Sequence, residues 1–261
     1  MEKEALEILT VEVKKWLRAA KDLIMMSFSE TIEVSEKSAR NDLVTNIDQE
    51  VQAFLIEQIK AYDPEANILA EESGENELSS LKGHVWVIDP IDGTLNFILQ
   101  QDHFCIMLGY FEDGIGQVGF IYEVMTDEFF WGGPALGVFT NEELLPKCPD
   151  TALADGLLGF NAVMYGHDRF QTRRVGDAAM GIRISGCAGI ELTQVLKGEL
   201  AGYVSNLYPW DYAAGKIMLE TLGYHVTDLF GKPLPFHGRT PFLAAGPRAH
   251  AEILEKVSDK Y

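Results

Sequence analysis

The chain has 261 residues, 47% of them hydrophobic, so it can bury a sizeable core as one large domain or as two lobes. Its 40 acidic and 21 basic residues give a formal net charge of -19, which disfavours nucleic acids and anionic membranes as partners. The same charge repels a phosphate ester, so a site that handles phosphate would need local positive charge, such as a metal ion.

The first half of the chain predicts two helices packed on an antiparallel sheet. Seven apolar residues between Leu6 and Ile24 recur at helical spacing, and a second helix is expected from about Thr45 to Tyr62. Short turn signals separate the later strands, which should therefore pair antiparallel. The expected strands lie at 68–70, 85–88, 104–111, 117–123, 128–132 and 137–140.

The second half alternates strands and helices, which predicts a second layered α/β lobe. Strands are expected near 157–161, 182–185, 201–205, 224–228 and 242–245. Helices are expected near 168–180, 187–197 and 209–222 and at the C-terminus. The polar segment 141–149 suggests a boundary, so we expect an N-terminal lobe at 1–145 and a C-terminal lobe at 146–261.

The three cysteines, Cys105, Cys148 and Cys187, are scattered and have no CxxC spacing. This pattern argues against a disulfide framework or a zinc cluster and favours a reducing cytoplasm. The N-terminal segment has no apolar signal core, and no apolar run approaches the roughly 18 residues that span a bilayer. We therefore expect a soluble cytoplasmic protein.

Acidic residues stand where predicted buried segments end or begin. Glu71 and Glu72 end one apolar strand, Asp89 ends another with Asp92 three residues later, and Asp211 opens a helix. Carboxylates in such places are costly unless they are paired or bind a metal, because like charges about 4 Å apart repel by roughly 4 kcal/mol. Oxygen ligands without a nearby histidine favour Mg²⁺, Mn²⁺ or Ca²⁺ over Zn²⁺.

Gly93 and Thr94 follow Asp92 directly. A glycine lets backbone N–H groups approach an anion, and the turn can open a helix whose N-terminus favours phosphate. Metals and amides could therefore converge on one phosphate and activate a water. Haloacid-dehalogenase-like phosphatases use a related DxDGT motif, but here Pro90 replaces the aspartate nucleophile two residues before Asp92.

Simpler structural roles stay open for several of these acids taken singly. Asp48 lies three residues after Thr45, as in a capping box, and Asp211 could be a helix N-cap. The pair Glu71-Glu72 could be a solvated loop. A mere turn does not require Asp89 at the end of a four-residue apolar strand, so the segment from Asp89 onward is the strongest indication of a functional site.

Four segments, in the expected order and spacing, resemble the inositol monophosphatase family. DPIDGTLNF at 89–97 is similar to its first signature, and WDYAAGKIMLETLGY at 210–224 to its second. KSARNDLVTNIDQ at 37–49 and ILAEESG at 68–74 also match. The resemblance implies a mixed α/β (α+β) fold, a layered α/β/α/β/α sandwich of the inositol monophosphatase and fructose-1,6-bisphosphatase type, and usually a homodimer.

The resemblance also implies two or three Mg²⁺ ions, with Mn²⁺ as an alternative. Their implied ligands are Glu71, Asp89, the carbonyl of Ile91, Asp92 and Asp211. Thr94, hydrogen-bonded to Asp48, would help to activate the attacking water, and Glu71 would hold a further metal and water. Water would attack directly in line, without a covalent phosphoenzyme.

The implied substrate contacts come from both halves of the chain. They are Asp92, Gly93, Thr94, Gly186, Cys187, Ala188 and Asp211. The amides of Gly93 and Thr94 would hold the phosphate, and the segment around Cys187 would contact the polyol, with cysteine in place of the more usual Ser or Thr. Lys37 matches a loop lysine near the site.

The sequence thus predicts Mg²⁺-dependent, lithium-sensitive hydrolysis of inositol monophosphate or a related polyol or sugar phosphate. Many inositol-preferring members have a glutamate where this chain has Val204, so fructose-1,6-bisphosphate, NADP, 3'-phosphoadenosine nucleotides and histidinol phosphate stay open as substrates. A non-catalytic regulatory binding protein or a metal buffer would not need both the carboxylates and the Gly93-Thr94 turn. The expected partners are a small phosphorylated substrate and a second copy of the chain, without nucleic acid or membrane.

Overall fold

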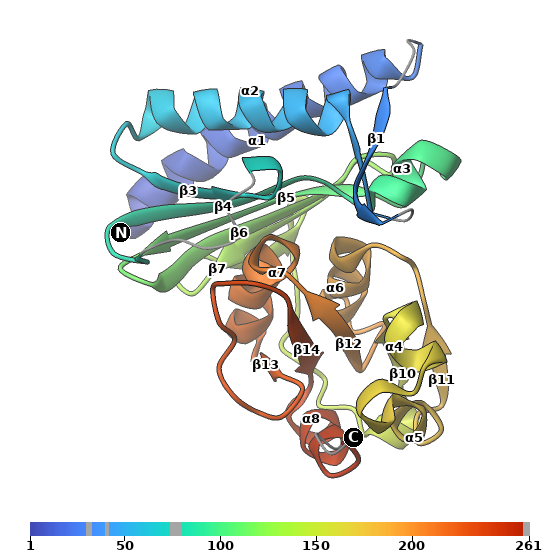
Figure 1. The fold of residues 1–261 in the computed structure, drawn as a ribbon. Helices are drawn as coiled ribbons and strands as arrows, with labels where there is room; N and C mark the ends of the chain where they lie inside the picture. Colours follow the sequence, from blue (N-terminus) through green and yellow to red (C-terminus); the bar gives the residue numbers. More distant parts are fainter. Residues whose placement is uncertain (30–32, 40–41, 74–79, 258–261) are drawn as a thin grey trace.

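Two helices, α1 (Lys3–Ser27) and α2 (Asn46–Tyr62), form an outer layer of the computed structural model, which describes residues 1–29, 33–39, 42–73 and 80–257 (Figure 1). The predicted stripe of α1 is confirmed, because its seven apolar residues from Leu6 to Ile24 are buried in one cluster with residues of α2 and the sheet below. Thr45 is the N-cap of α2, close to the expected start of that helix.

A hairpin of β1 (Val34–Ala39) and β2 (Asp42–Thr45) precedes α2. The sequence does not predict this hairpin, because the segment is largely polar and lacks the apolar–polar alternation of a half-buried strand. Its second strand leads directly into α2 and so places Asp48 in the first turn of that helix.

The second layer is a seven-stranded sheet in the order β3-β4-β5-β6-β7-β8-β9. Its strands are β3 (Asn67–Ala70), β4 (His84–Asp92), β5 (Cys105–Glu112), β6 (Ile115–Glu123), β7 (Glu128–Gly133), β8 (Gly137–Thr140) and β9 (Glu143–Leu144). From β4 onward all neighbours pair antiparallel, as predicted, whereas β3 pairs parallel with β4. The two-residue β9 is too short to leave a pattern in the sequence.

Both faces of this sheet are covered, which explains why residues 85–88 are apolar without a break. Trp86 and Ile88 pack with α1 and α2, whereas Val85 and Val87 pack with α7 (Pro209–Leu222) on the opposite face. Side chains alternate between the faces of a strand, so the next position on the α7 side is Asp89. Alternation along β4 therefore directs this carboxylate into the interior.

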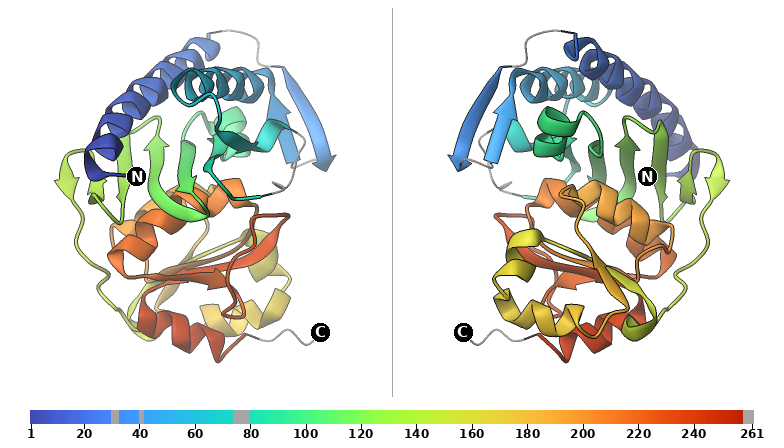
Figure 2. Two further views of the ribbon diagram at one scale, coloured as in Figure 1. Left: turned by 90° about the vertical axis from the view of Figure 1, so that its left-hand side faces the viewer. Right: turned by 90° about the vertical axis from the view of Figure 1, so that its right-hand side faces the viewer.

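Helices α6 (Ala188–Leu196) and α7 form the third layer, between the two sheets (Figure 2). Gly119 lets α7 lie very close to the first sheet, because a Cβ there would come within 2.2 Å of the carbonyl oxygen of Ala214. The close approach fixes the position of α7, and with it Asp211 in its first turn. The predicted end of α7 at Gly223 is confirmed, with φ 99°.

A five-stranded sheet in the order β11-β10-β12-β14-β13 is the fourth layer. Its strands are β10 (Leu157–Phe160), β11 (Gly181–Arg183), β12 (Gly202–Leu207), β13 (His225–Asp228) and β14 (Thr240–Ala245). The outer helices are α4 (Ala162–Gly166), α5 (Thr172–Gly176) and α8 (Pro247–Leu254). The α/β/α/β/α sandwich is therefore confirmed (Figure 2). The division into lobes at 145/146 stays a prediction.

The single helix expected near 168–180 is wrong. Helix α4 ends at Gly166, a 3-10 turn spans Arg169–Gln171, and α5 covers only Thr172–Gly176. Asp168, Phe170 and Gln171 have positive φ angles, which a continuous right-handed helix cannot contain. Among the described residues, no helix is both long and apolar enough to cross a membrane.

Candidate active site

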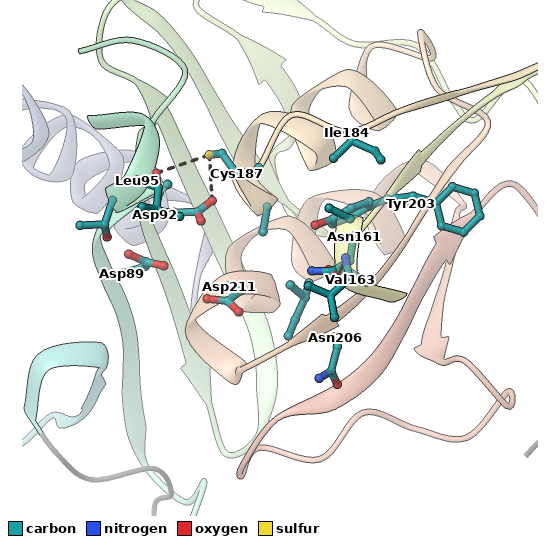
Figure 3. A pocket seen from close by; sticks show the side chains of 18 of the residues that line it. Asp89, Asp92, Leu95, Asn161, Val163, Ile184, Cys187, Tyr203, Asn206 and Asp211 are labelled. Carbon is teal, nitrogen blue, oxygen red and sulfur yellow. Dashed lines mark hydrogen bonds between the residues drawn. The ribbon is translucent and has the colours of Figure 1, made fainter. Parts of the chain in front are cut away.

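A cavity of about 330 Å³ lies where β4 ends, α3 (Thr94–Gln100) begins and the N-termini of α6 and α7 meet (Figure 3). Of the site residues expected from the sequence, those that line it are Glu71, Asp89, Ile91, Asp92, Gly93, Thr94, Gly186, Cys187, Ala188 and Asp211. The fold thus brings these residues into one cavity, although their individual roles stay predictions. Asp48 does not line the cavity but reaches it through Thr94.

Strand register explains how Glu71 comes to lie beside Asp89. In the parallel pair of β3 and β4, Leu69 is opposite Val87 and Ala70 is opposite Ile88. Glu71 follows Ala70 and Asp89 follows Ile88, so the two residues are neighbours, and both line the cavity. The alternative of a solvated loop pair does not fit Glu71, which lines the cavity in the 3-10 turn Glu71–Ser73.

Asp92 is held from behind by groups on β5 and α6. The pairing of β4 with β5 is irregular between Asp89 and Asp92, and it places Asp92 opposite Cys105. Its Oδ2 atom accepts hydrogen bonds from the Gly189 amide and from the thiol of Cys187, whose sulfur is 3.1 Å away. The sequence singled out neither Cys105 nor Gly189, because nothing in their local patterns indicates a contact with residue 92.

Asp211 occupies the third position of α7, and Tyr208 is the N-cap. Its Oδ2 atom accepts a hydrogen bond from the Tyr208 amide at 2.8 Å, which completes half of a capping box. The idea that Asp211 could itself be the N-cap is therefore wrong by three residues. The capping contact orients the carboxylate, which also lines the cavity together with Asp89 and Asp92 (Figure 3).

Burial and the neighbouring carboxylates raise the pKa values of Asp89 and Asp211. Burial raises the pKa of Asp89 well above its usual range, and the neighbouring charges of Glu71, Asp92 and Asp211 add to this effect. Burial also raises the pKa of Asp211 well above its usual range, with Asp92 and Glu71 contributing. Both shifts disfavour the charged form, and a cation bound beside these carboxylates would favour it.

The donor set fits a hard divalent cation. Asp89 is 1% exposed, and its buried Oδ1 atom has no hydrogen-bond partner among the described residues, which is costly unless a cation occupies the adjacent space. Three further carboxylates, those of Glu71, Asp92 and Asp211, and the Ile91 backbone line the same cavity and can supply oxygen ligands. Oxygen ligands of this kind suit Mg²⁺, Mn²⁺ or Ca²⁺.

Thr94 and Asp48 form a pair at the edge of the cavity. The Thr94 hydroxyl oxygen lies 3.3 Å from Oδ1 of Asp48 and 3.2 Å from the carbonyl oxygen of Ile91. Oδ2 of Asp48 accepts hydrogen bonds from the amide and hydroxyl of Thr45 in a capping box. The structural and catalytic interpretations of Asp48 are therefore compatible, because each uses a different oxygen.

Arg239 is the only lysine or arginine among the described residues that line the cavity. Its guanidinium group lies 4.6 Å from the centroid of the Tyr208 ring, which in turn stacks on Trp210 with centroids 4.7 Å apart. No pattern in the sequence indicated this residue, since it lies in a loop 28 positions beyond Asp211. Lys37 lies in β1, but its side chain is outside the described residues.

Val204 does not line the cavity. Its side chain is fully buried in an apolar cluster with residues such as Leu158 and Leu243. Its neighbours in β12, among them Ser205 and Asn206, do line the cavity and offer polar groups to a substrate.

The chain is similar in sequence to known proteins along almost its whole length. A family model described as the inositol monophosphatase family matches residues 5–260. The inositol-1-monophosphatase of Bacillus subtilis strain 168 is 38% identical over 252 residues, which cover 93% of this chain and 94% of the relative.

Two solved structures extend the comparison. The crystal structure of an IMPase/NADP phosphatase complexed with Mg²⁺ and phosphate is 28% identical, with a TM-score of 0.89, and the match covers 98% of this chain and 97% of the other. The staphylococcal inositol monophosphatase-1, in a LiCl-soaked inhibitory complex, is 27% identical with a TM-score of 0.88. That match covers 100% of this chain and 97% of the other.

Proposed function

The chain belongs to the inositol monophosphatase family, and on this premise we propose that it is a Mg²⁺-dependent phosphatase of inositol monophosphate or a related polyol or sugar phosphate. The observation that carries the proposal is the convergence of Glu71, Asp89, Asp92 and Asp211 on one cavity. The Thr94–Asp48 pair at its edge supplies the groups that a hydrolytic step needs.

The proposed metal-binding groups are the four carboxylates and the Ile91 carbonyl, for two or three Mg²⁺ ions or for Mn²⁺. The raised pKa values of Asp89 and Asp211 support this assignment, as does the Oδ1 atom of Asp89, which has no hydrogen-bond partner in the part of the chain that the structure describes. Bound metal supplies charge for the phosphate oxygens and lowers the pKa of a coordinated water.

Thr94 and Asp48 would orient the attacking water. Because Oδ1 of Asp48 can accept the Thr94 hydroxyl proton, the lone pairs of that hydroxyl oxygen are left to accept a hydrogen bond from water. Asp48 is fully buried and held by Thr45, so its Oδ1 atom is fixed in position before substrate arrives. This preorganisation supports in-line attack by water without a covalent intermediate.

The proposed phosphate contacts are the amides of Gly93 and Thr94. Gly93 has φ 89°, and a Cβ there would lie 3.0 Å from Cβ of Cys187 and 3.2 Å from the carbonyl oxygen of His103. Both the backbone angle and the close packing therefore require glycine at this position. Exposed amides at such a turn can donate to phosphate oxygens.

A second candidate is a substrate with another anionic group, such as fructose-1,6-bisphosphate or NADP. Arg239 favours this alternative, because its guanidinium group lines the cavity and can bind a second phosphate through two parallel hydrogen bonds. Asn161 and Asn206 also line the cavity and can donate to sugar hydroxyls. Val204 contributes no polar group, so the contacts to a polyol must come from these neighbours.

We also propose a homodimer and a cytoplasmic location. The family resemblance supports the dimer, and three free cysteines among the described residues support a reducing compartment. A purely regulatory binding protein is the remaining alternative, but it would have no need of the four carboxylates together with the Thr94–Asp48 pair.

The proposal is tested by measuring phosphate release from a panel of esters with Mg²⁺ and with a chelator. The panel should include inositol 1-phosphate, glycerol phosphate, fructose-1,6-bisphosphate and NADP. We expect Mg²⁺-dependent release that the chelator abolishes and that Asp89→Asn reduces by a factor of about 100 or more. Absence of release from every ester, with the protein folded and Mg²⁺ present, would favour the regulatory alternative.

A further inference from the structure

Two cysteines that are 82 positions apart in the chain meet behind Asp92. The sulfur atoms of Cys105 and Cys187 are 3.8 Å apart, and both face the Oδ2 atom of Asp92. The distances from Oδ2 are 3.7 Å to the sulfur of Cys105 and 3.1 Å to the sulfur of Cys187. The sequence argued against a zinc cluster because it has no CxxC spacing, but the fold assembles two thiols and a carboxylate within 4.8 Å.

The triangle of these three atoms is close to one face of a tetrahedral metal site, because its S···S distance agrees with the expected edge and its S···O distances of 3.1 and 3.7 Å lie on either side of the expected value. With Zn–S bonds of about 2.3 Å and a Zn–O bond of about 2.0 Å, tetrahedral angles place two sulfurs about 3.8 Å apart and a sulfur and an oxygen about 3.5 Å apart. We propose that Cys105, Cys187 and Oδ2 of Asp92 form a binding site for a soft divalent cation, represented by Zn²⁺ or Cd²⁺.

The cavity gives a cation a route to two of these three ligand atoms. Asp92 and Cys187 line the cavity (Figure 3), so a cation can enter from there and keep a water as its fourth ligand. Cys105 is fully buried and does not line the cavity. On the other side the backbone of Gly189 packs directly against the thiols, since a Cβ there would lie 2.1 Å from the sulfur of Cys105 and 3.0 Å from that of Met107.

The donor chemistry separates this site from the oxygen-lined one. Thiolate sulfur selects Zn²⁺ and related soft ions, whereas Mg²⁺ prefers oxygen. Binding would release both thiol protons to the solvent and leave two thiolates and one carboxylate around the cation. Without the cation, the same thiols donate hydrogen bonds to Asp92 and hold its carboxylate in place.

Asp92 would then belong to two metal sites. A soft cation on its Oδ2 atom would withdraw electron density from the carboxylate and fix its orientation. We therefore expect Zn²⁺ and Cd²⁺ to inhibit hydrolysis, and excess Mg²⁺ should not reverse this, because thiols are poor Mg²⁺ ligands. This consequence rests on the proposed phosphatase function, whereas the binding site itself does not.

The test is direct observation of metal–sulfur bonds in the whole protein, reduced with a phosphine and kept in excess Mg²⁺. X-ray absorption of the Zn²⁺-loaded wild type should show two sulfur ligands at about 2.3 Å. Titration with Cd²⁺ should give the ultraviolet charge-transfer band of Cd–thiolate bonds. A first shell of oxygen and nitrogen alone would overturn the proposal without any variant being needed.

Cysteine variants identify the ligands. Cys105→Ser and Cys187→Ser should each remove most of the Cd–thiolate band and weaken Cd²⁺ binding by about 100-fold, since even indirect partners of a ligand are worth 10- to 100-fold. Cys148→Ser is the matched control, because Cys148 lies outside the cluster and should leave binding unchanged. Full retention of the band in either Cys105→Ser or Cys187→Ser would overturn the assignment, and thermal melting confirms that each variant is folded.

The inhibition assay separates the two proposals. Cd²⁺ bound through both thiols without effect on Mg²⁺-dependent turnover would overturn the inhibitory role and leave the phosphatase assignment intact. A protein that binds Cd²⁺ in this way but releases no phosphate from any ester in Mg²⁺ alone would overturn the phosphatase assignment instead.

Discussion

The carboxylate of Asp48 holds two elements at once, because Oδ1 lies 3.3 Å from the Thr94 hydroxyl oxygen while Oδ2 accepts hydrogen bonds from Thr45. Substitutions at the three positions can therefore separate capping from catalysis. Thr94→Ala should lower kcat by 10- to 1,000-fold with a smaller change in KM, because the hydroxyl is assigned to the water rather than to substrate binding. Steady-state kinetics and thermal melting of the same samples measure both effects.

The matched variant for Oδ2 of Asp48 is Thr45→Ala, which removes the hydroxyl of the helix cap. It should cost about 1 kcal/mol of stability through the lost cap and reduce kcat only modestly. Asp48→Asn should both lower the stability and lower kcat, since its amide nitrogen must replace one of the two accepting oxygens. If Asp48→Asn melts earlier but turns over at the wild-type rate, Asp48 is a helix cap and nothing more.

Much of the scaffold of this site could be predicted from the sequence because its elements carry strong periodic patterns. The apolar stripe of α1 reflects burial of one face of the helix. The unbroken apolar run at 85–88 reflects burial of both faces of the strand. The carboxylates at strand ends could be recognised because a charge adjoining a buried run has few structural explanations. Positions defined only by tertiary contacts, such as Cys105 and Arg239, leave no local pattern and could not be found.

Two expectations from the sequence are wrong, and each has a physical cause. The segment 168–180 has the composition of a helix, but three residues with positive φ break it, and their conformation depends on packing. The sequence allows Asp211 as an N-cap because it stands near the start of a helix, but Pro209 occupies the first helical position and Tyr208 is the cap. Both cases show that local rules place an element more securely than its ends.

Asp89→Asn should stabilise the metal-free protein while it removes metal binding. Burial and three neighbouring carboxylates raise the pKa of Asp89. The contribution of this group to the free energy of unfolding is therefore complete below the unfolded-state pKa of about 4 and is lost as the pH rises through the folded-state pKa. The free energy of unfolding in a chelator should therefore fall with pH above about 4. This decrease in the free energy of unfolding should be smaller in Asp89→Asn, by about 1.4 kcal/mol for each unit by which folding raises the pKa of Asp89.

Urea denaturation at several pH values, with and without Mg²⁺, measures this effect. The wild type should gain stability from Mg²⁺ because the ion binds only the folded state, and Asp89→Asn should gain much less. Asp102→Asn is a suitable control, since Asp102 is a more exposed aspartate that does not line the cavity. Equal stabilisation of wild type and Asp89→Asn by Mg²⁺ would show that Asp89 is not a ligand.

Lithium should inhibit turnover. A staphylococcal relative has been crystallised as a LiCl-soaked inhibitory complex, and this chain has the same fold with a TM-score of 0.88. We expect inhibition that depends on the Mg²⁺ concentration, measured as phosphate release with KCl at equal ionic strength as the control. Equal rates in LiCl and KCl at tens of millimolar would show that the metal positions of this chain differ from those of the relative.

Arg239 offers a way to distinguish a monophosphate from a substrate with a second anionic group. Its guanidinium group is held by stacking on Tyr208, and the described part of the cavity lining has no other cationic side chain. Arg239→Met keeps most of the apolar stem but removes the charge. It should lower kcat/KM for fructose-1,6-bisphosphate or NADP by about tenfold or more, equivalent to about 1.4 kcal/mol, while glycerol phosphate is hydrolysed almost as before.

Arg239→Lys tests whether charge alone is sufficient. Lysine keeps the charge but loses both the planar stacking on Tyr208 and the paired donors, so it should restore only part of the preference for a second anionic group. The ratio of kcat/KM values between bisphosphate and monophosphate substrates, measured for the wild type and both variants, gives the result independently of enzyme concentration. If the ratio is the same in all three proteins, Arg239 does not contact the substrate, and its role is confined to the packing of Tyr208 and Trp210 beside Asp211.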